Sequence, residues 1–156
     1  MKIMFVCHGN ICRSPMAEII MRDMVKRAAL SEKITVASSA TSTEEIGNPV
    51  YPPAQRELIS HGLSPKGKYA VQLTRADYEK YDYFVGMDSA NIRNMHRIFG
   101  SDPDGKILKL LDLTGKGGDV ADPWYVGSFD RTYADCEAGC RAILSLYDSD
   151  ADSLKL

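Results

Sequence analysis

The feature that most restricts the fold of this chain is the alternation of short apolar runs with segments of helical periodicity. The runs that we predict to be strands are residues 2–7, 34–39, 81–87 and 106–111. Strands that alternate with helices are joined by right-handed crossovers and build a parallel sheet. We therefore predict an α/β fold in which helices cover both faces of a parallel sheet.

The helices are predicted from apolar residues at helical spacing and from signals at the helix ends. Pro15 suits the first turn of a helix, where no partner is needed for its missing N–H. Asp88 is a typical N-cap residue. Helices are expected from residue 14, over residues 54–61, from residue 74, after residue 88 and over residues 129–147. We expect the polar tail after residue 148 to be frayed.

Size and charge limit the class of protein. The 156 residues are 44% hydrophobic, which suits a single domain over residues 1–156. A net charge of -2 provides no basic field for nucleic acid or for anionic lipid, and no apolar run is long enough to span a membrane. Four cysteines without an export signal favour reduced thiols in a cytoplasm. We expect a monomer or a weak dimer.

The loop between the first strand and the first helix is the strongest candidate site. Its backbone N–H groups and the positive end of the helix can converge on one anion, which predicts a phosphate-binding loop after the first strand. The residues that we expect to bind phosphate or support the loop are His8, Gly9, Asn10, Ile11, Cys12 and Ser14. A thiol with the usual pKa of about 8.5 is only about 0.3% ionised at pH 6, and such a cradle would favour the thiolate.

Two residues of this loop are expected to carry the chemistry. Cys7 lies where the strand ends and is the predicted nucleophile, while Arg13 can grip two phosphate oxygens through its planar fork. Ser14 can donate a hydrogen bond to the thiolate, and Asn10 tolerates a left-handed backbone. The alternative is that Cys7 is a small buried hydrophobe and Arg13 a surface charge.

A carboxylic acid must also reach the site from far along the chain, since a leaving oxygen departs faster when it is protonated. Asp122 in Asp122-Pro123-Trp124-Tyr125 is the predicted acid, and Trp124 and Tyr125 are predicted to wall the pocket. Asp119 is a rival acid, and Asp-Pro is also a common turn pair. The glycine-rich residues 115–118 lack the spacing of a nucleotide-binding loop, so we interpret them as a hinge.

The segment from Cys7 to Glu18 resembles the active-site motif of the low-molecular-weight protein tyrosine phosphatases, and the likeness extends to Asp88-x-x-Asn91 and Asp122-Pro123. The resemblance implies a four-stranded parallel sheet and a phosphocysteine mechanism without metal or cofactor. It implies a phosphotyrosine-containing protein or peptide as substrate, Asp122 as general acid, and Cys12 as the partner of a reversible disulfide with Cys7. At the rim, Glu44 stands where relatives have an aromatic residue.

Finer features of the resemblance concern specificity and competing classes. Ile11 favours phosphotyrosine, since arginine phosphatases of this family tend to have threonine there. A thioredoxin-coupled arsenate reductase would need further cysteines between roughly residues 75 and 95, where none occurs. A noncatalytic phosphate-binding module is the other alternative. Cys136 and Cys140 are expected to pack in the core.

Overall fold

A computed structural model of the protein describes residues 1–127 and 129–156. The main sheet contains β1 (Lys2–Cys7), β2 (Thr35–Ala40), β3 (Tyr83–Gly86) and β4 (Ile107–Lys109) in the order β2-β1-β3-β4. Each neighbouring pair is parallel. The predicted four-stranded parallel sheet is confirmed.

The strand order places the first loop at a special point of the sheet. β1 lies between β2 and β3, so the chain leaves β1 toward one side and later returns to pair on the other. Cys7 pairs with Ala40, and Val6 pairs with Gly86, so the carboxyl ends of these strands are level. In open α/β sheets, ligands bind beyond the carboxyl ends at such a switch point. The loop after Cys7 occupies it.

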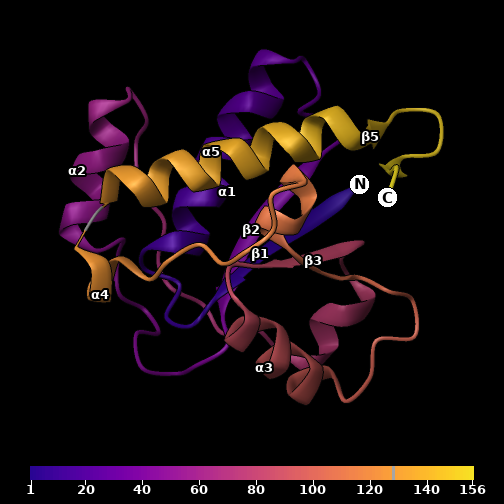
Figure 1. The fold of residues 1–156 in the computed structure, drawn as a ribbon, viewed down its shortest axis with the longest axis horizontal. Helices are drawn as coiled ribbons and strands as arrows, with labels where there is room; N and C mark the ends of the chain where they lie inside the picture. The colour runs from indigo at the N-terminus through magenta and orange to yellow at the C-terminus, as the bar shows by residue number, and fades with distance from the viewer. Residues whose placement is uncertain (128) are drawn as a thin grey trace.

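Helices cover both faces of the sheet, as predicted (Figure 1). On one side lie α1 (Arg13–Arg27), α2 (Pro52–Ser60) and α5 (Phe129–Leu146), and α1 packs along α5. On the other lie α3 (Ser89–Phe99) and the 3-10 helix η1 (Arg75–Glu79), which contact each other. The 3-10 helix η2 (Leu110–Thr114) follows β4, and the short α4 (Pro123–Val126) precedes α5.

The core follows the alternation of β1, whose successive side chains point to opposite faces. Ile3, Phe5 and Cys7 belong to the apolar cluster beneath α1 and α5. Met4 and Val6 belong to a second cluster with residues of η1 and α3. Cys7 therefore points to the face that α1 covers, and the strand fixes the direction of its side chain.

Two predictions about the C-terminal half were inaccurate. The fourth strand ends at Lys109, because Leu110 turns inward, becomes fully buried and starts η2. The tail is not frayed: β5 (Tyr147–Asp148) pairs with β6 (Ser153–Leu154) in an antiparallel hairpin. Asp152 in its turn contacts the Met1 ammonium at 2.9 Å, so the two chain ends lie side by side (Figure 1). The polar composition of the tail did not indicate this hairpin.

The outer edge of β2 is covered by two cationic side chains. Arg22 of α1 donates to the Val36 carbonyl at 3.1 Å, and Lys68 donates to the Ser38 carbonyl at 3.0 Å. Both carbonyls face away from β1, so they have no partner within the sheet ladder.

No helix among residues 1–127 and 129–156 is both long enough and apolar enough to cross a membrane.

Candidate active site

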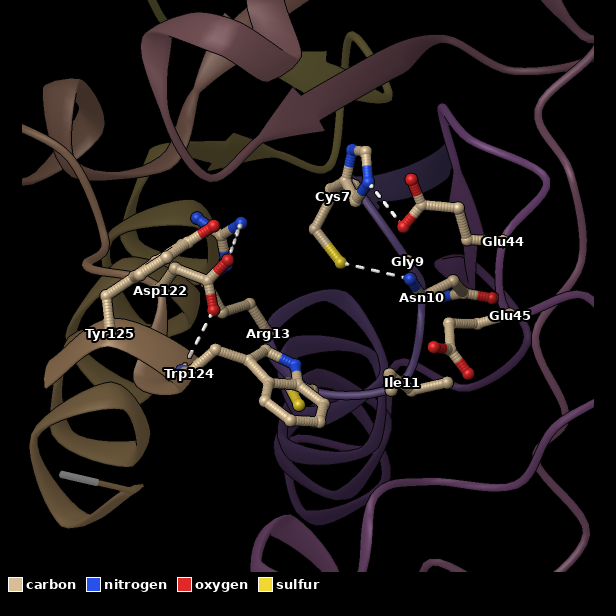
Figure 2. A pocket seen from close by; sticks show the side chains of 12 residues that line it. Cys7, Gly9, Asn10, Ile11, Arg13, Glu44, Glu45, Asp122, Trp124 and Tyr125 are labelled. Carbon is tan, nitrogen blue, oxygen red and sulfur yellow. Dashed lines mark hydrogen bonds and ion pairs between the residues drawn. The ribbon is translucent and has the colours of Figure 1, made fainter. Parts of the chain in front are cut away.

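A pocket of about 440 Å³ lies at the carboxyl ends of the strands. It is lined by Cys7, His8, Gly9, Asn10, Ile11, Cys12, Arg13, Glu44, Glu45, Asp122, Trp124 and Tyr125. These residues include each site residue that the sequence predicted, except Ser14, which is fully buried behind the loop. Segments far apart in the chain thus meet around Cys7 (Figure 2).

The backbone of the loop curls around the Cys7 sulfur. Asn10 has a φ of 58°, the left-handed conformation that the sequence predicted for it. This bend brings the Asn10 amide to the sulfur, with an N–Sγ distance of 3.3 Å. The Ser14 hydroxyl reaches the same sulfur at 3.0 Å. Both groups can stabilise a negative charge on the thiolate.

A hydrogen-bond network holds the loop from below. The Asn10 side-chain amide donates to Ser14 Oγ at 2.8 Å and to Ser38 Oγ at 2.9 Å. Its oxygen accepts from the Val71 N–H at 3.1 Å, which fixes the orientation of the amide. Ser38 then donates to the buried carboxylate of Glu18 at 2.6 Å. Lys68 lies 3.3 Å from the same Glu18 oxygen and supplies the opposite charge.

The network sets one of the hydrogen bonds that the Ser14 hydroxyl makes. The two N–H groups of the Asn10 side-chain amide donate to Ser14 and to Ser38, so the Ser14 oxygen accepts from Asn10. A serine hydroxyl has one proton to donate. That proton is available to Cys7 Sγ, 3.0 Å away, and such a bond would stabilise a thiolate, while the second lone pair of Ser14 Oγ can accept from the neutral thiol.

Arg13 is the first residue of α1 and is almost completely buried. Its Nη1 donates to Asp88 Oδ2 at 2.7 Å and to the Val120 carbonyl at 3.0 Å. Its Nη2 lies 3.6 Å from Asp122 Oδ2. Burial opposes the charge, but Cys7, Asp88 and Asp122 outweigh it and raise the pKa of Arg13. The guanidinium is thus held in one orientation at the pocket.

Asp122 lies on the other side of the pocket from Cys7 (Figure 2). It is the N-cap of α4, where its Oδ1 accepts from the Trp124 N–H at 3.1 Å. The Asp-Pro pair does form a turn, and the turn presents the carboxylate to the pocket. The Trp124 ring packs on Tyr51 with centroids 4.4 Å apart, whereas Tyr125 is 89% exposed.

The rival acid Asp119 does not line the pocket. Its Oδ1 lies 3.0 Å from Lys109 Nζ and 3.3 Å from the Ser89 hydroxyl. Burial opposes its ionisation, but these two partners outweigh it and hold the pKa of Asp119 below its usual value. Asp119 is therefore a bound carboxylate, and of the two it is Asp122 that lines the pocket with Cys7.

Charged side chains form the rim opposite Trp124 and Tyr125 (Figure 2). His8 Nε2 lies 3.1 Å from Glu44 Oε2, and both side chains are exposed. Glu45, which the sequence analysis did not select, accepts from the Asn48 side chain at 2.7 Å. The rim is aromatic on one side and acidic on the other.

The remaining cysteines differ from Cys7. Burial raises the pKa of the Cys12 thiol to about 12, and nearby Cys7 and Asp122 add to the rise. Cys136 and Cys140 are fully buried against α1, as predicted, and burial raises their pKa values. Within the described residues, no cluster of His, Cys, Asp and Glu is arranged to hold a metal ion.

The family of low molecular weight phosphotyrosine protein phosphatases matches residues 2–153 of this chain. The chain belongs to this family. A member from Bacillus subtilis, the low molecular weight protein-tyrosine-phosphatase YfkJ, is 37% identical over 92% of this chain and 93% of its own length. The human low molecular weight phosphotyrosine protein phosphatase is also 37% identical, over 91% and 92% of the two chains.

Solved structures agree with this membership. The crystal structure of YfkJ superposes with a TM-score of 0.90 and covers 93% of this chain and 92% of its own. A structure of the arginine phosphatase YwlE, a mutant whose active-site serine is phosphorylated, superposes with a TM-score of 0.85 at 28% identity, covering 98% and 100% of the two chains. The family fold therefore extends over nearly the whole chain.

Several residues at this family site were not selected from the sequence. Asp88 was predicted as an N-cap and as part of the family likeness, without a role in the site, yet it also binds Arg13. Glu18, Ser38 and Lys68 form the support of the loop. A signal for Glu18 was available, since it is a carboxylate four residues after Ser14 on the buried side of α1. The contact of the Val120 carbonyl with Arg13 could not be predicted from the sequence, because every residue type has a backbone carbonyl.

Proposed function

We propose that this protein is a cysteine-dependent protein tyrosine phosphatase that hydrolyses phosphotyrosine and small aryl phosphates. The observation that carries the proposal is the convergence of Cys7, Arg13 and Asp122 on one pocket, with the Ser14 hydroxyl and the Asn10 amide directed at the sulfur. Membership of the family supports it.

In the first step, the Cys7 thiolate attacks phosphorus in line with the leaving phenol. The S–P bond forms while the P–O bond to the tyrosine ring breaks, and Asp122 gives its proton to the departing oxygen. Arg13 and the loop amides stabilise the charge on the equatorial phosphate oxygens. Arg13 is suited to this because Asp88 and Val120 already fix its Nη1.

In the second step, water attacks the phosphocysteine. Asp122, now a carboxylate, accepts a proton from that water, and the S–P bond breaks to release phosphate and regenerate the thiolate. The phosphorylated active-site serine in the YwlE mutant is a related covalent state in a relative, and it supports a phosphoenzyme here. Asn10 and Ser14 would receive the thiolate as it leaves.

Phosphotyrosine is the proposed substrate rather than phosphoarginine. The apolar Ile11 lines the pocket, and the Trp124 ring forms an aromatic wall that suits a phenyl group. Phosphoarginine remains a test substrate because YwlE is an arginine phosphatase.

We further propose that Cys12 forms a reversible disulfide with Cys7 under oxidation. Four free cysteines support a reducing, cytoplasmic location.

The test is hydrolysis of para-nitrophenyl phosphate at about pH 5–6 with reductant and chelator, followed by phosphotyrosine and phosphoarginine peptides. We expect turnover in the wild type, none in Cys7→Ser and a strong decrease of kcat in Asp122→Ala, which also loses the base of the second step. Binding of phosphate without turnover by the reduced wild type would instead support a phosphate-binding module. Activity retained in Cys7→Ser would show that Cys7 is not the nucleophile.

A further inference from the structure

The chain reaches Asp122 through a glycine-rich segment whose backbone is bound back to η2, where the Gly117 N–H donates to the Leu111 carbonyl at 3.0 Å. η2 ends at Thr114, and Gly115, Gly117 and Gly118 follow with φ values of 81°, 70° and 89°. These are conformations that glycine adopts more readily than other residues. A Cβ added to Gly115 or Gly118 would meet no atom within 4 Å, so neither position is packed against a neighbour.

The two residues after the glycines are, in contrast, firmly attached. Asp119 Oδ1 lies 3.0 Å from Lys109 Nζ and 3.3 Å from Ser89 Oγ. The Val120 N–H donates to the Met87 carbonyl at 2.9 Å, and the Val120 carbonyl accepts from Arg13. The chain is therefore tied to the body of the protein two to three residues before Asp122.

The groups that bind Asp119 come from regular elements. Lys109 is the last residue of β4, and Ser89 is the first residue of α3. Their side chains also contact each other, with 3.4 Å between Lys109 Nζ and Ser89 Oγ. The Lys109 side chain is only 18% exposed, whereas that of Asp119 is 47% exposed. A mostly buried cation on a strand thus holds a carboxylate of the loop.

We propose that Lys109, acting through Asp119, is a positioning residue for the general acid Asp122. Neither Lys109 nor Asp119 lines the pocket, so neither touches the substrate. Their contact ties the end of the glycine segment to β4 and α3. This inference rests on the proposed function, because it assumes that Asp122 donates the proton.

The test compares two leaving groups in the Lys109→Met variant. Phenyl phosphate releases a weak acid, as phosphotyrosine does, and depends strongly on protonation of the leaving oxygen, whereas para-nitrophenyl phosphate releases a far more acidic phenol. General acid catalysis contributes about 10²–10⁴-fold. We expect kcat/KM for phenyl phosphate to fall about tenfold and that for para-nitrophenyl phosphate less than about twofold.

Three further variants sharpen the test. Asp119→Ala should reproduce the effect of Lys109→Met, and Lys109→Arg should restore most of the activity toward phenyl phosphate. Lys116→Met is the matched control, since it removes an exposed lysine from the same loop. It should leave kcat/KM unchanged for both substrates. Thermal unfolding of each variant separates these effects from a loss of folded protein.

The decisive measurement uses the Asp122→Ala background. There Lys109→Met should cause no further loss, because no acid remains to be positioned. An equal loss for both substrates, or a further loss in this background, would overturn the positioning role. If Asp122→Ala itself leaves kcat/KM for phenyl phosphate unchanged, the proposed role of Asp122 fails and the inference fails with it.

Discussion

Two regions of the molecule meet at the pocket, and they are built in opposite ways. The phosphate loop is mostly buried, and its buried polar side chains are linked by hydrogen bonds and an ion pair from Cys7 to Glu18 and Lys68. The segment that carries Asp122 is glycine-rich and mostly exposed, with anchors concentrated at Asp119 and Val120.

This difference matches the role that we propose for each region. The loop must present several donors to phosphate at once, and preorganised donors cost no rearrangement during the reaction. The acid segment presents one carboxyl group and an aromatic wall, for which a few anchors suffice. The comparison predicts that changes in the loop affect every substrate, whereas changes in the acid segment depend on the leaving group.

Arg13→Lys should have the largest effect, because Arg13 joins the two regions by binding Asp88 and Val120 while facing Asp122. Lysine lacks the planar fork and cannot keep these contacts while holding two phosphate oxygens. We expect kcat/KM for phosphotyrosine and para-nitrophenyl phosphate to fall about 10²–10³-fold. Steady-state kinetics check this, and a loss of less than about tenfold would contradict the clamp.

Asn10→Ala should follow, with losses in both activity and stability. It removes one hydrogen bond each from Ser14, Ser38 and the Val71 N–H and forces alanine into a φ of 58°. We expect the free energy of unfolding to fall by about 2–4 kcal/mol and kcat/KM for both substrates to fall at least about tenfold.

Asn10→Gly is the control for the backbone, since glycine accepts this φ but makes none of the side-chain hydrogen bonds. Urea denaturation should find Asn10→Gly about 1 kcal/mol more stable than Asn10→Ala. Equal stability of the two variants would show that strain at residue 10 is unimportant.

Trp124→Ala tests the wall of the acid segment and should have a moderate effect. The ring packs on Tyr51, and an aromatic contact with a substrate ring is worth about 0.5–1.5 kcal/mol. We expect KM for a phosphotyrosine peptide to rise about 2–10-fold with little change in kcat. A fall in kcat without a change in KM would instead indicate that α4 had shifted Asp122.

The smallest effect is expected at Cys12, the second thiol in the pocket. A pKa of about 12 keeps Cys12 protonated throughout the neutral range, so it contributes no charge to the cradle below strongly alkaline pH. Cys12→Ser should change kcat/KM by less than about twofold under reducing conditions. In the wild type at pH 6–8, iodoacetamide should label Cys7 and spare Cys12, as read by peptide mass spectrometry.

Much of this arrangement could be predicted from the sequence, because local patterns specify it. The apolar run before Cys7 and the proline at residue 15 define a strand and a helix, and the alternation along the chain then fixes the carboxyl edge where Asp122 must lie. The partners of Arg13 could not be predicted in the same way. Asp88 and Val120 approach it only through tertiary packing, and a buried carbonyl has no residue type to reveal it.

The covered edge of β2 has a consequence for behaviour in concentrated solution. A strand with free carbonyls on its outer side is a template on which a strand of another molecule can add. Arg22 and Lys68 occupy the carbonyls of Val36 and Ser38 and so deny that template to a second copy. Because Lys68 and Arg22 also both contact the Glu18 carboxylate beneath the phosphate loop, the two cations that cover the sheet edge also support that loop.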